Sequence, residues 1–498
     1  MSFLSIDVGS SRCKAAIFSA SGEMQAMRSA AYSPHCPGPG FAELEAGTFL
    51  NVVTALAKEL ARIPASEAIQ AVCFSSHGET VIPVSAAGQA LGAAILNIDG
   101  RATSEAAWVE DEIGRRQLFM LTGHTCHAMY TLPKILWLRS HAPEIFHAAS
   151  SFQSVTSFLL LQLGLPPLVD YSHASRFMAF DVIQRIWSTD LLELVGISPQ
   201  ALPLPVQAGT VAGRLDSTAA AMLGVTAGTP VVVGGHDQVI GAVGLGVIQA
   251  GRAAGSLGTY ECITVASDHL LLNEAAMHSS LNSYPGAVPG RFVTIAYFPG
   301  GIMMQWLGNL LHEPGMQEEE YHLADLESAA PAGPTGLLIT PHLIGSCNPE
   351  FDAHARATIS GLTFESSRAH LYKGILEGIA AELAIVTECL ENAGSTFSDI
   401  NVFGGGIRSS LGLRLRAAFT RKRLHIMSCQ ESVCLGGAML ASVAVGIHSD
   451  LESAAQAMVR EQESVPDDPL LAEQYRPQIK SYRQLRSMLV HRHNQQNS

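Results

Sequence analysis

Residues 3–19 of the chain read FLSIDVGSSRCKAAIFS, and their pattern organises the whole sequence. An apolar strand ends near Asp7, a turn of glycine and serine follows, and a second strand begins near Lys14. Glycine allows the backbone of such a turn to approach a phosphate closely, because a Cβ atom would hold the phosphate off. Residues 255–265, GSLGTYECITV, repeat this order of turn and strand in the second half of the chain. The repeat predicts two related lobes, each of which opens with a β-turn-β element.

The remaining sequence alternates strand and helix patterns, which predicts an α/β protein. Strands are expected at residues 3–8, 14–19, 23–32, 69–75, 231–233, 262–265 and 400–403. Helices are expected at residues 46–63, 366–393, 409–420 and 432–445, and across most of 103–225. The first lobe is expected to comprise residues 1–247 and the second residues 248–485, with a polar tail at 486–498. A short hinge near residues 245–252 would join the lobes, because no low-complexity linker separates them.

Composition excludes several classes of protein. The 498 residues carry a net charge of −14, whereas a general nucleic-acid-binding protein needs a basic face to displace counterions. The nine cysteines form no C-x-x-C pair and no zinc-like spacing with histidine, which favours a reduced, cytoplasmic protein. The first residues lack the basic region of a signal peptide, and no stretch reaches the ~18 uninterrupted apolar residues of a membrane helix. We therefore expect a soluble cytoplasmic protein that binds neither nucleic acid nor membrane.

Three glycine turns follow predicted strands and would suit a polyanion. They lie at residues 7–14, 255–259 and 404–409. Asp7 stands beside the first turn, where a carboxylate would repel phosphate unless Mg²⁺ bridges the two groups. Asp237 follows two glycines and precedes an apolar helix. It is interpreted either as the cap of that helix or as a general base that takes a proton from an attacking hydroxyl.

Two polar clusters end other predicted strands and favour a hydroxyl-rich substrate. They are residues 75–79, SSHGE, and residues 99–101, DGR. Ligands of open sheets collect beyond the carboxyl ends of the strands, where these side chains would offer hydrogen-bond partners. Other phosphate-binding folds are excluded, because the chain has no Gly-Lys pair for a P-loop and no H-R-D or D-F-G set. Residues 404–409, GGGIRS, fall short of the dinucleotide-binding fingerprint.

Taken together, the motifs resemble those of the FGGY family of carbohydrate kinases, in order and along nearly the whole chain. This family is part of the superfamily of ATPases related to actin, hexokinase and the heat-shock chaperones. The resemblance is carried by Asp7 to Ser11 with Lys14, Gly40 to Glu43, His77-Gly78, Asp99 to Arg101, Asp170 to Ser175, Gly235 to Gln238, Gly255 to Thr259, Gly301 with Gln305-Trp306, Gly404 to Gly406, and Glu431 with Gly436 to Ala438. Each motif is modest alone, and their common order is the specific signal.

The resemblance implies two ribonuclease-H-like lobes, as in actin-like ATPases, around a central catalytic cleft. It implies transfer of the γ-phosphoryl group of ATP to a hydroxyl of a small sugar, such as a pentulose or another ketose, or of a polyol. The first lobe would bind the sugar and the second ATP, with Asp237 as the base and Asp7 positioning Mg²⁺. The implied nucleotide-binding residues are Gly9, Ser10, Ser11, Lys14, Gly258, Thr259, Gly301, Gln305, Gly405, Gly406 and Arg408. The implied substrate-binding residues are Ser76, His77, Gly78, Glu79, Asp99, Arg101, Tyr130, Asp237 and Gln238.

The chain also departs from the family pattern. Glycerol kinases carry Arg-Glu where this chain has Gly78-Glu79, which argues against glycerol as the substrate. The helix after residue 409 lacks the Asp that family members often carry there. A non-catalytic sensor of sugar or nucleotide is the alternative on the same scaffold, although a sensor would need neither Asp7 nor Asp237. A chaperone is disfavoured, because the chain ends soon after the second lobe. The sequence names neither the sugar nor the oligomeric state, for which a homodimer is one arrangement.

Overall fold

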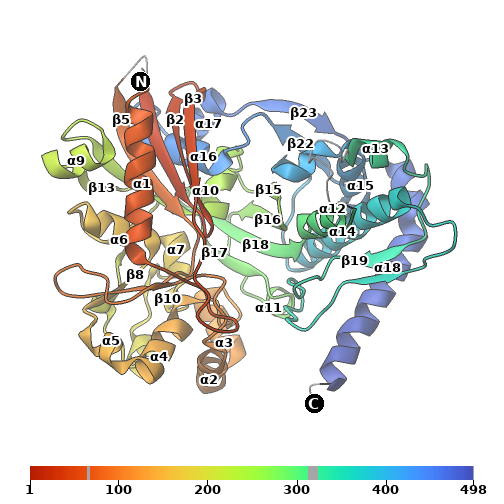
Figure 1. Ribbon diagram of the computed structural model, residues 1–498, viewed down its shortest axis with the longest axis horizontal. Helices are drawn as coiled ribbons and strands as arrows, with labels where there is room; N and C mark the ends of the chain where they lie inside the picture. Colours follow the sequence, from red (N-terminus) through yellow and green to blue (C-terminus); the bar gives the residue numbers. More distant parts are fainter. Residues whose placement is uncertain (64–67, 312–322, 497–498) are drawn as a thin grey trace.

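The computed structural model describes residues 1–63, 68–311 and 323–496, which fold into two α/β lobes (Figure 1). Each lobe is built around one mixed sheet, and the chain passes from the first lobe (red to yellow) to the second (green to blue). The α/β fold class expected from the sequence is confirmed. None of the helices in these ranges combines the length and the apolar character that a bilayer crossing needs.

The first sheet has six strands in the order β13-β14-β5-β1-β2-β3. Their bounds are Val211–Arg214 (β13), Pro230–His236 (β14), Ile69–Ser76 (β5), Ser2–Val8 (β1), Arg12–Ser19 (β2) and Met24–Ala31 (β3). Strands β1, β5 and β14 run parallel, so their carboxyl ends meet at one edge of the sheet. We call this the carboxyl edge. Asp7, Ser76 and His236 lie there, and Asp7 is opposite Lys14 in the antiparallel pair of β1 and β2.

The second sheet has seven strands in the order β17-β18-β16-β15-β21-β22-β23. Their bounds are Asn282–Pro285 (β17), Phe292–Pro299 (β18), Tyr260–Ser267 (β16), Arg252–Leu257 (β15), Asp399–Phe403 (β21), Arg423–Met427 (β22) and Glu461–Val465 (β23). The strands β18-β16-β15-β21-β22 repeat the order and directions of β3-β2-β1-β5-β14. The repeat predicted from the glycine turns is therefore present in the topology, with the strand order of a ribonuclease-H-like lobe.

One helix from the second half of the chain packs on the sheet of the first lobe. α1 (Ala46–Ala61) covers β2 and β3, whereas α16 (Ser432–Ala444) covers β1 and β5 and lies against α10 (Asp237–Gly244). Glycines permit the close approach of α10 and α16. A Cβ atom on Gly244 would lie 1.9 Å from the carbonyl oxygen of Ser432, and one on Gly436 would lie 2.0 Å from that of Ile240.

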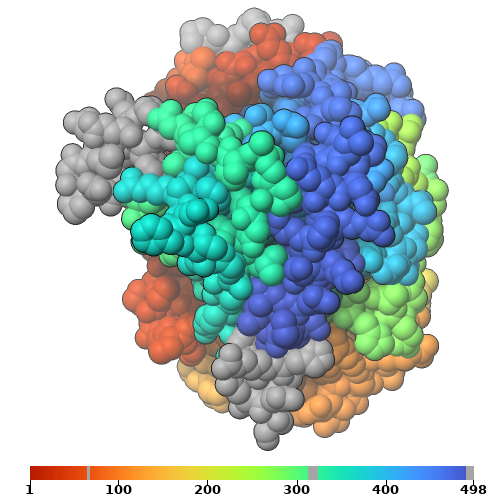
Figure 2. Space-filling view, turned by 90° about the vertical axis from the view of Figure 1, so that its right-hand side faces the viewer, coloured from red at the N-terminus to blue at the C-terminus, as the bar shows by residue number. Residues whose placement is uncertain are grey.

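The second lobe is covered by long helices. α14 (Arg368–Asn392) and α15 (Ser410–Thr420) pack on each other and on the second sheet. α18 (Pro469–Gln496) packs on α15 and on β19 (Leu338–Thr340), and it forms part of the blue surface in Figure 2. The other helices are α2 (Thr103–Ile113), α3 (Arg115–Thr122), α4 (Thr131–His141), α5 (Pro143–Ala148), α6 (Val155–Gln162), α7 (Tyr171–Ser175), α8 (Thr189–Leu194), α9 (Ser217–Leu223), α11 (Glu274–His278), α12 (Gly301–Leu311), α13 (Leu323–Ser328) and α17 (Leu451–Met458). The other strands pair in twos: β4 (Glu43–Leu44) with β7 (Ala94–Ile95), β6 (Ile82–Val84) with β8 (Ser151–Gln153), β9 (Leu168–Asp170) with β12 (Leu204–Val206), β10 (Phe180–Asp181) with β11 (Ile186–Trp187), and β19 with β20 (Thr358–Ser360).

The tail expected at residues 486–498 is instead the end of α18, which continues to Gln496. Arg486 is buried in this helix. Its Nε lies 3.0 Å from Glu382 Oε1, and its Nη1 lies 2.6 Å from Glu350 Oε1. Buried charges persist in folded proteins when they are paired, so this ion pair fastens α18 to the second lobe. The segment is polar in composition, so the sequence did not indicate this buried ion pair.

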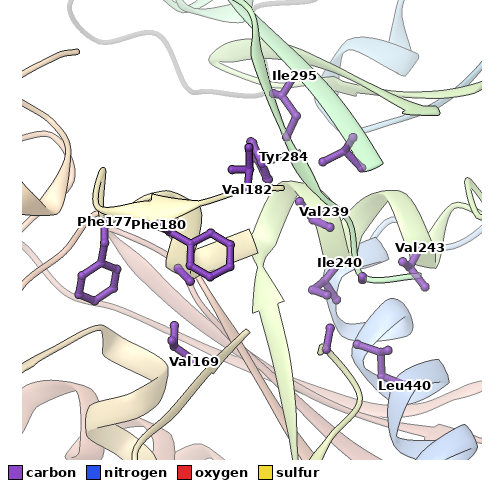
Figure 3. Close-up of a cluster of buried hydrophobic side chains, with 14 of the residues drawn as sticks. Val169, Phe177, Phe180, Val182, Val239, Ile240, Val243, Tyr284, Ile295 and Leu440 are labelled. Atoms are coloured by element: carbon purple, nitrogen blue, oxygen red, sulfur yellow. The ribbon is translucent and has the colours of Figure 1, made fainter. Parts of the chain in front are cut away.

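A hydrophobic cluster spans both lobes and seats α10 (Figure 3). Its labelled members are Val169, Phe177, Phe180, Val182, Val239, Ile240, Val243, Tyr284, Ile295 and Leu440. Three of them lie on α10, and the others come from the first lobe, from β17 and β18, and from α16. Burial of each large apolar side chain contributes about 1.5–3 kcal/mol, so the start of α10 is held firmly in place.

Candidate active site

Two aspartates meet at the carboxyl edge of the first sheet. Asp7 lies near the end of β1, and its Oδ1 is enclosed without a hydrogen-bond partner among the described residues. Burial, together with the nearby negative charge of Asp237, raises the pKa of Asp7 to about 8. A divalent cation would satisfy both the unpaired oxygen and the excess negative charge.

Asp237 is the first residue of α10, and His236 occupies the cap position, so the helix-cap interpretation is wrong. Asp237 Oδ1 accepts a hydrogen bond from the backbone N–H of Gln238 (2.6 Å) and lies 3.4 Å from His236 Nε2. Burial raises the pKa of Asp237 to about 6. The group is therefore ionised at neutral pH and can take up a proton near it, as a general base must. Asp237 and Gln238 line a small cavity together with Ser256 of the second lobe.

An ion pair joins the first glycine turn to α16. Lys14 Nζ lies 2.7 Å from Glu431 Oε2, and Glu431 is the residue before α16. The predicted phosphate-binding residues 9–11 form the turn between β1 and β2. The part that these residues and Lys14 take in nucleotide binding stays a prediction.

The last residue of β5 and the loop after it are the predicted substrate residues 76–79. Both ring nitrogens of His77 are used within the protein: Nδ1 lies 2.9 Å from the carbonyl oxygen of Val8, and Nε2 lies 2.7 Å from Thr80 Oγ1. Ser76 Oγ lies 3.1 Å from His173 Nε2. These contacts fix the loop beside the carboxyl edge, and they leave any contact of Ser76 and His77 with a substrate as a prediction.

Asp99 and Arg101 form an ion pair that also holds Glu43. Arg101 Nη2 lies 2.8 Å from Asp99 Oδ2 and 2.7 Å from Glu43 Oε1. The guanidinium carbon of Arg101 lies 4.0 Å from the ring centroid of Phe41 and 4.7 Å from that of Trp137. Arg101 therefore anchors the segment around Glu43 to the first lobe. A contact of Asp99 or Arg101 with a substrate stays a prediction.

A cavity of about 800 Å³ lies in the second lobe. Its lining brings together seven of the predicted nucleotide-binding residues, namely Gly258, Thr259, Gly301, Gln305, Gly405, Gly406 and Arg408. Tyr372, Leu376 and Ile379 of α14 add an apolar wall that suits a flat ring. The predicted residues of the first lobe, 9–11 and Lys14, are not part of this lining.

The glycines around this cavity have different structural roles. Gly404 has a φ of 99°, in the left-handed region that favours glycine, and it makes the turn after β21 possible. A Cβ atom on Gly405 would have no atom of the described residues within 4 Å apart from its chain neighbours, so a side chain there would enter the cavity. A Cβ atom on Gly301 would lie 2.5 Å from the carbonyl oxygen of Gly258, and glycine is therefore needed for α12 to begin so close to the β15–β16 turn.

A second cavity, of about 920 Å³, lies where the lobes join, between residues 248–250 and residues 449–452. None of the predicted site residues lines it. Size alone therefore does not identify the active site, and the position of the carboxylates and glycine turns does.

Both halves of the chain match one family. Residues 2–244 match the N-terminal domain of the FGGY family of carbohydrate kinases, and residues 253–445 match its C-terminal domain. The chain belongs to this family. It is therefore an ATP-dependent sugar kinase, as the resemblance of its motifs implied.

Curated relatives and solved structures agree with this assignment. The FGGY kinase is 25% identical over 461 residues to a xylulose kinase of Bacillus subtilis strain 168, covering 92% of this chain and 91% of the relative. It is 27% identical over 501 residues to an autoinducer-2 kinase of Photorhabdus laumondii, covering 95% and 91%. The crystal structure of ligand-bound xylulose kinase from Lactobacillus acidophilus has the same fold, with a TM-score of 0.91, 23% identity and 98% of each chain covered.

Sequence reasoning missed several polar residues of this FGGY kinase that lie around Tyr130 and Asp237. They are His124, Arg176, His236, Asn282, Tyr284 and Tyr297. The predicted Tyr130 joins them, because its hydroxyl lies 3.1 Å from both His124 Nδ1 and Asn282 Oδ1. One signal was present in the sequence, an arginine placed between the polar stretch 172–175, SHAS, and the apolar run 177–180. Asn282 and the two tyrosines come from the second lobe, and nothing local marks them.

Proposed function

We propose that this FGGY kinase transfers the γ-phosphoryl group of ATP to a hydroxyl of a small ketose, such as a pentulose, with Asp237 as the general base. The observation that carries the proposal is the position of Asp237, with its pKa of about 6, beside Asp7 and in one cavity with Ser256 of the second glycine turn. A non-catalytic sensor would gain nothing from a buried carboxylate poised to take up a proton near neutral pH.

The proposed reaction begins with deprotonation of the acceptor. Asp237 takes the proton of the acceptor hydroxyl as its oxygen attacks the γ-phosphorus of ATP. The bond between the γ-phosphorus and the bridging oxygen to the β-phosphate breaks, so that ADP leaves and a sugar phosphate forms. Most of the catalysis comes from positioning and from neutralisation of charge on the transferred group.

Asp7 fits the role of positioning Mg²⁺. Its Oδ1 has no partner in the described part of the chain, and burial leaves its negative charge poorly compensated. Mg²⁺ commonly takes one or two protein carboxylates and completes its shell with water and phosphate oxygens. When bound, Mg²⁺ would neutralise part of the charge on the phosphates of ATP. Asp7 would hold this ion through water ligands.

The second-lobe cavity supports the placement of ATP. The backbone N–H groups of residues 258–259 and 405–406 would meet its phosphates, and the apolar wall of α14 would meet its adenine ring. The relatives named xylulose kinase and autoinducer-2 kinase support a small-molecule acceptor, which for the first of them is a ketose.

A panel of acceptors tests the proposal. Pentuloses, hexuloses and alditols are incubated with the purified protein, Mg²⁺ and ATP, and ADP release is measured with and without each acceptor. At least one ketose is expected to stimulate ADP release well above the acceptor-free rate and to yield one sugar phosphate per ADP. Binding of ketoses without any stimulation would instead support the sensor, and the proposed kinase function would be withdrawn.

A further inference from the structure

Arg176 is a buried cation that the proposed mechanism does not use. It directly follows α7, and only 2% of its surface is exposed. Its Nε and Nη2 pair with Oε1 of Glu79, which is itself buried. Its Nη1 has no hydrogen-bond partner among the described residues. A buried donor without a partner is rare in folded proteins and indicates that a ligand or water completes the site.

The local sequence makes room for this arginine. A Cβ atom on Gly78 would lie only 3.2 Å from Arg176 Cγ and 3.0 Å from His236 Cδ2, so glycine lets Arg176 pass over the loop. Glu79 has a φ of 62°, and its carbonyl oxygen accepts a hydrogen bond from the buried Lys134 Nζ (3.2 Å). The Gly78-Glu79 pair thus presents a carboxylate to an arginine that comes from another element of the fold.

Side chains from both lobes surround the guanidinium. Its carbon lies 5.3 Å from the ring centroid of Tyr130 and 6.0 Å from that of Tyr284, and the His124 ring lies 5.0 and 5.1 Å from the same two rings. Four more buried atoms of this group lack a partner within the described ranges: His124 Nε2, His236 Nδ1, Tyr284 OH and Tyr297 OH. So many unpaired polar atoms around one cation indicate a site for a polar ligand.

These unpaired atoms include both donors and acceptors. His124 Nδ1 lies 2.9 Å from Asn282 Oδ1, which can only accept, so Nδ1 carries the proton and Nε2 is an acceptor. Burial lowers the pKa of His124 to about 3 and also lowers the pKa of His236, so both rings are neutral. Tyrosine hydroxyls donate and accept. Sugar hydroxyls, which also do both, complement such a mixture.

The charges of the group limit what can bind there. Glu79 neutralises Arg176, and the nearby Asp237 adds a negative charge when it is ionised. An acceptor with a carboxylate would bring a further anion close to Glu79 and Asp237 in a buried site, which is unfavourable. A ketone or hydroxyl oxygen accepts a hydrogen bond from Nη1 without this repulsion.

We infer that Arg176 determines acceptor specificity: its Nη1 donates a hydrogen bond to an oxygen of an uncharged, polyhydroxylated acceptor, and Glu79 excludes acceptors that carry a carboxylate. The inference rests on the proposed function, because it names the groups that select the acceptor of that phosphoryl transfer. It also explains why an arginine and a glutamate that lie 97 residues apart are both buried here.

Two variants test the two parts of the inference with D-xylulose and its five-carbon carboxylate counterpart, D-xylonate. Arg176→Met removes the donor and keeps much of the apolar length. The KM for D-xylulose is expected to rise at least about tenfold, the effect of one charge-assisted hydrogen bond, while the KM for ATP stays unchanged. Glu79→Gln leaves Arg176 unneutralised. The ratio of kcat/KM for D-xylonate to that for D-xylulose is expected to rise at least about tenfold.

Arg486→Met is the matched control, because it breaks another buried pair of arginine and glutamate in α18, outside the predicted site. It is expected to lower the Tm and to leave the KM for D-xylulose unchanged. Binding is also read without turnover, as the rise in Tm that D-xylulose causes. This rise is expected in the wild type and lost in Arg176→Met.

A folded Arg176→Met protein with the wild-type KM and Tm rise would overturn the inference, as would a Glu79→Gln protein with an unchanged ratio. If Arg176→Met does not fold, two other variants decide. Glu79→Gln is judged by the ratio of kcat/KM values, and Tyr284→Phe, which removes one unpaired hydroxyl, is judged by the KM for D-xylulose and the rise in Tm. A wild type whose Tm responds to no neutral sugar or polyol would also overturn it. A wild type that binds D-xylulose through Arg176 but transfers no phosphate would refute the proposed function and leave the inference standing.

Discussion

Replacing Asp237 by Asn removes the proposed base and little else. Asparagine has nearly the same size, and its Oδ1 can still accept the hydrogen bond that the N–H of Gln238 donates over 2.6 Å. The start of α10 does not depend on a carboxylate there, because His236 and not Asp237 is the cap residue. Loss of the charge also relieves the repulsion that raises the pKa of Asp7. The Tm of Asp237→Asn is therefore expected to equal or slightly exceed that of the wild type.

The size of the effect follows from the chemistry of a lost base. With a pKa of about 6, Asp237 is ionised in about ten molecules for each protonated one at pH 7. Wild-type kcat/KM should thus be near its maximum at pH 7 and should halve near pH 6, because proton uptake removes the base of the free enzyme. Loss of a general base lowers turnover about 10²- to 10⁴-fold, which corresponds to about 3–5 kcal/mol of transition-state stabilisation.

The assay is ADP release with both substrates below their KM values, followed from about pH 5 to pH 8, where the decline of kcat/KM near pH 6 reports the base of the free enzyme. Asp237→Asn should bind both substrates with nearly wild-type affinity and should lose the decline in kcat/KM near pH 6. Ser256→Ala is the control, since removal of one hydroxyl from the second glycine turn costs only about 0.5–1.5 kcal/mol and keeps that decline. An Asp237→Asn protein that phosphorylates its sugar at close to the wild-type rate would refute the assignment.

Three further predictions concern the nucleotide, the cation and the cleft. Gly405→Val should weaken the binding of ATP at least about tenfold and leave sugar binding intact, because the valine side chain would enter the second-lobe cavity. Equal losses of affinity for ATP and for sugar in isothermal titration would instead indicate misfolding. Asp7→Asn should abolish most turnover and raise the stability of the ligand-free protein at pH 8 by up to about 5 kcal/mol in urea denaturation. In the folded protein the pKa of Asp7 is raised from 3.8 to about 8, so between pH 3.8 and pH 8 the folded wild type binds more protons than the unfolded chain. The wild type therefore loses stability as the pH rises through this range. A difference in stability between Asp7→Asn and the wild type that does not change with pH would contradict this. Mg-ATP and sugar together should lower the radius of gyration in small-angle scattering, since the glycine turns at 9–11 and 258–259 belong to different sheets, and an unchanged radius at saturation would count against closure of the cleft.

The sequence predicted the parts of the site that local chemistry marks. A glycine turn after an apolar strand is recognisable within ten or so residues, and it needs glycine for a reason that holds in any fold. The seven second-lobe residues expected around the nucleotide therefore line one cavity. The repeat of the first turn at residues 255–259 likewise predicted the repeated order of strands. The sequence did not show which glycine of the third turn needs a positive φ: it is Gly404, whereas a Cβ atom on Gly405 would meet none of the described residues beyond its chain neighbours within 4 Å.

The features that were missed depend on contacts between distant segments. Arg176 meets Glu79 across 97 residues, and Tyr284 reaches the same group from the other lobe. No pattern in either segment encodes such a meeting, because burial of a charge depends on what the rest of the chain supplies. The anchoring of Arg486 by Glu382 was hidden in the same way within a segment that is polar in composition.

The packing of α16 on β1 and β5 means that the protein cannot be divided near residues 245–252, where the sequence predicts a hinge, into two independent modules. A fragment that ends at residue 247 would expose the face of the first sheet that α16 covers, where a Cβ atom on Gly437 would lie only 2.2 Å from Ser5 Oγ. The complementary fragment would carry α16 as an apolar helix with no sheet to cover. Each half expressed alone is therefore expected to aggregate, whereas the two halves expressed together have every contact they need to reassemble. A gene shortened to the first lobe would therefore have to carry a copy of α16 with it.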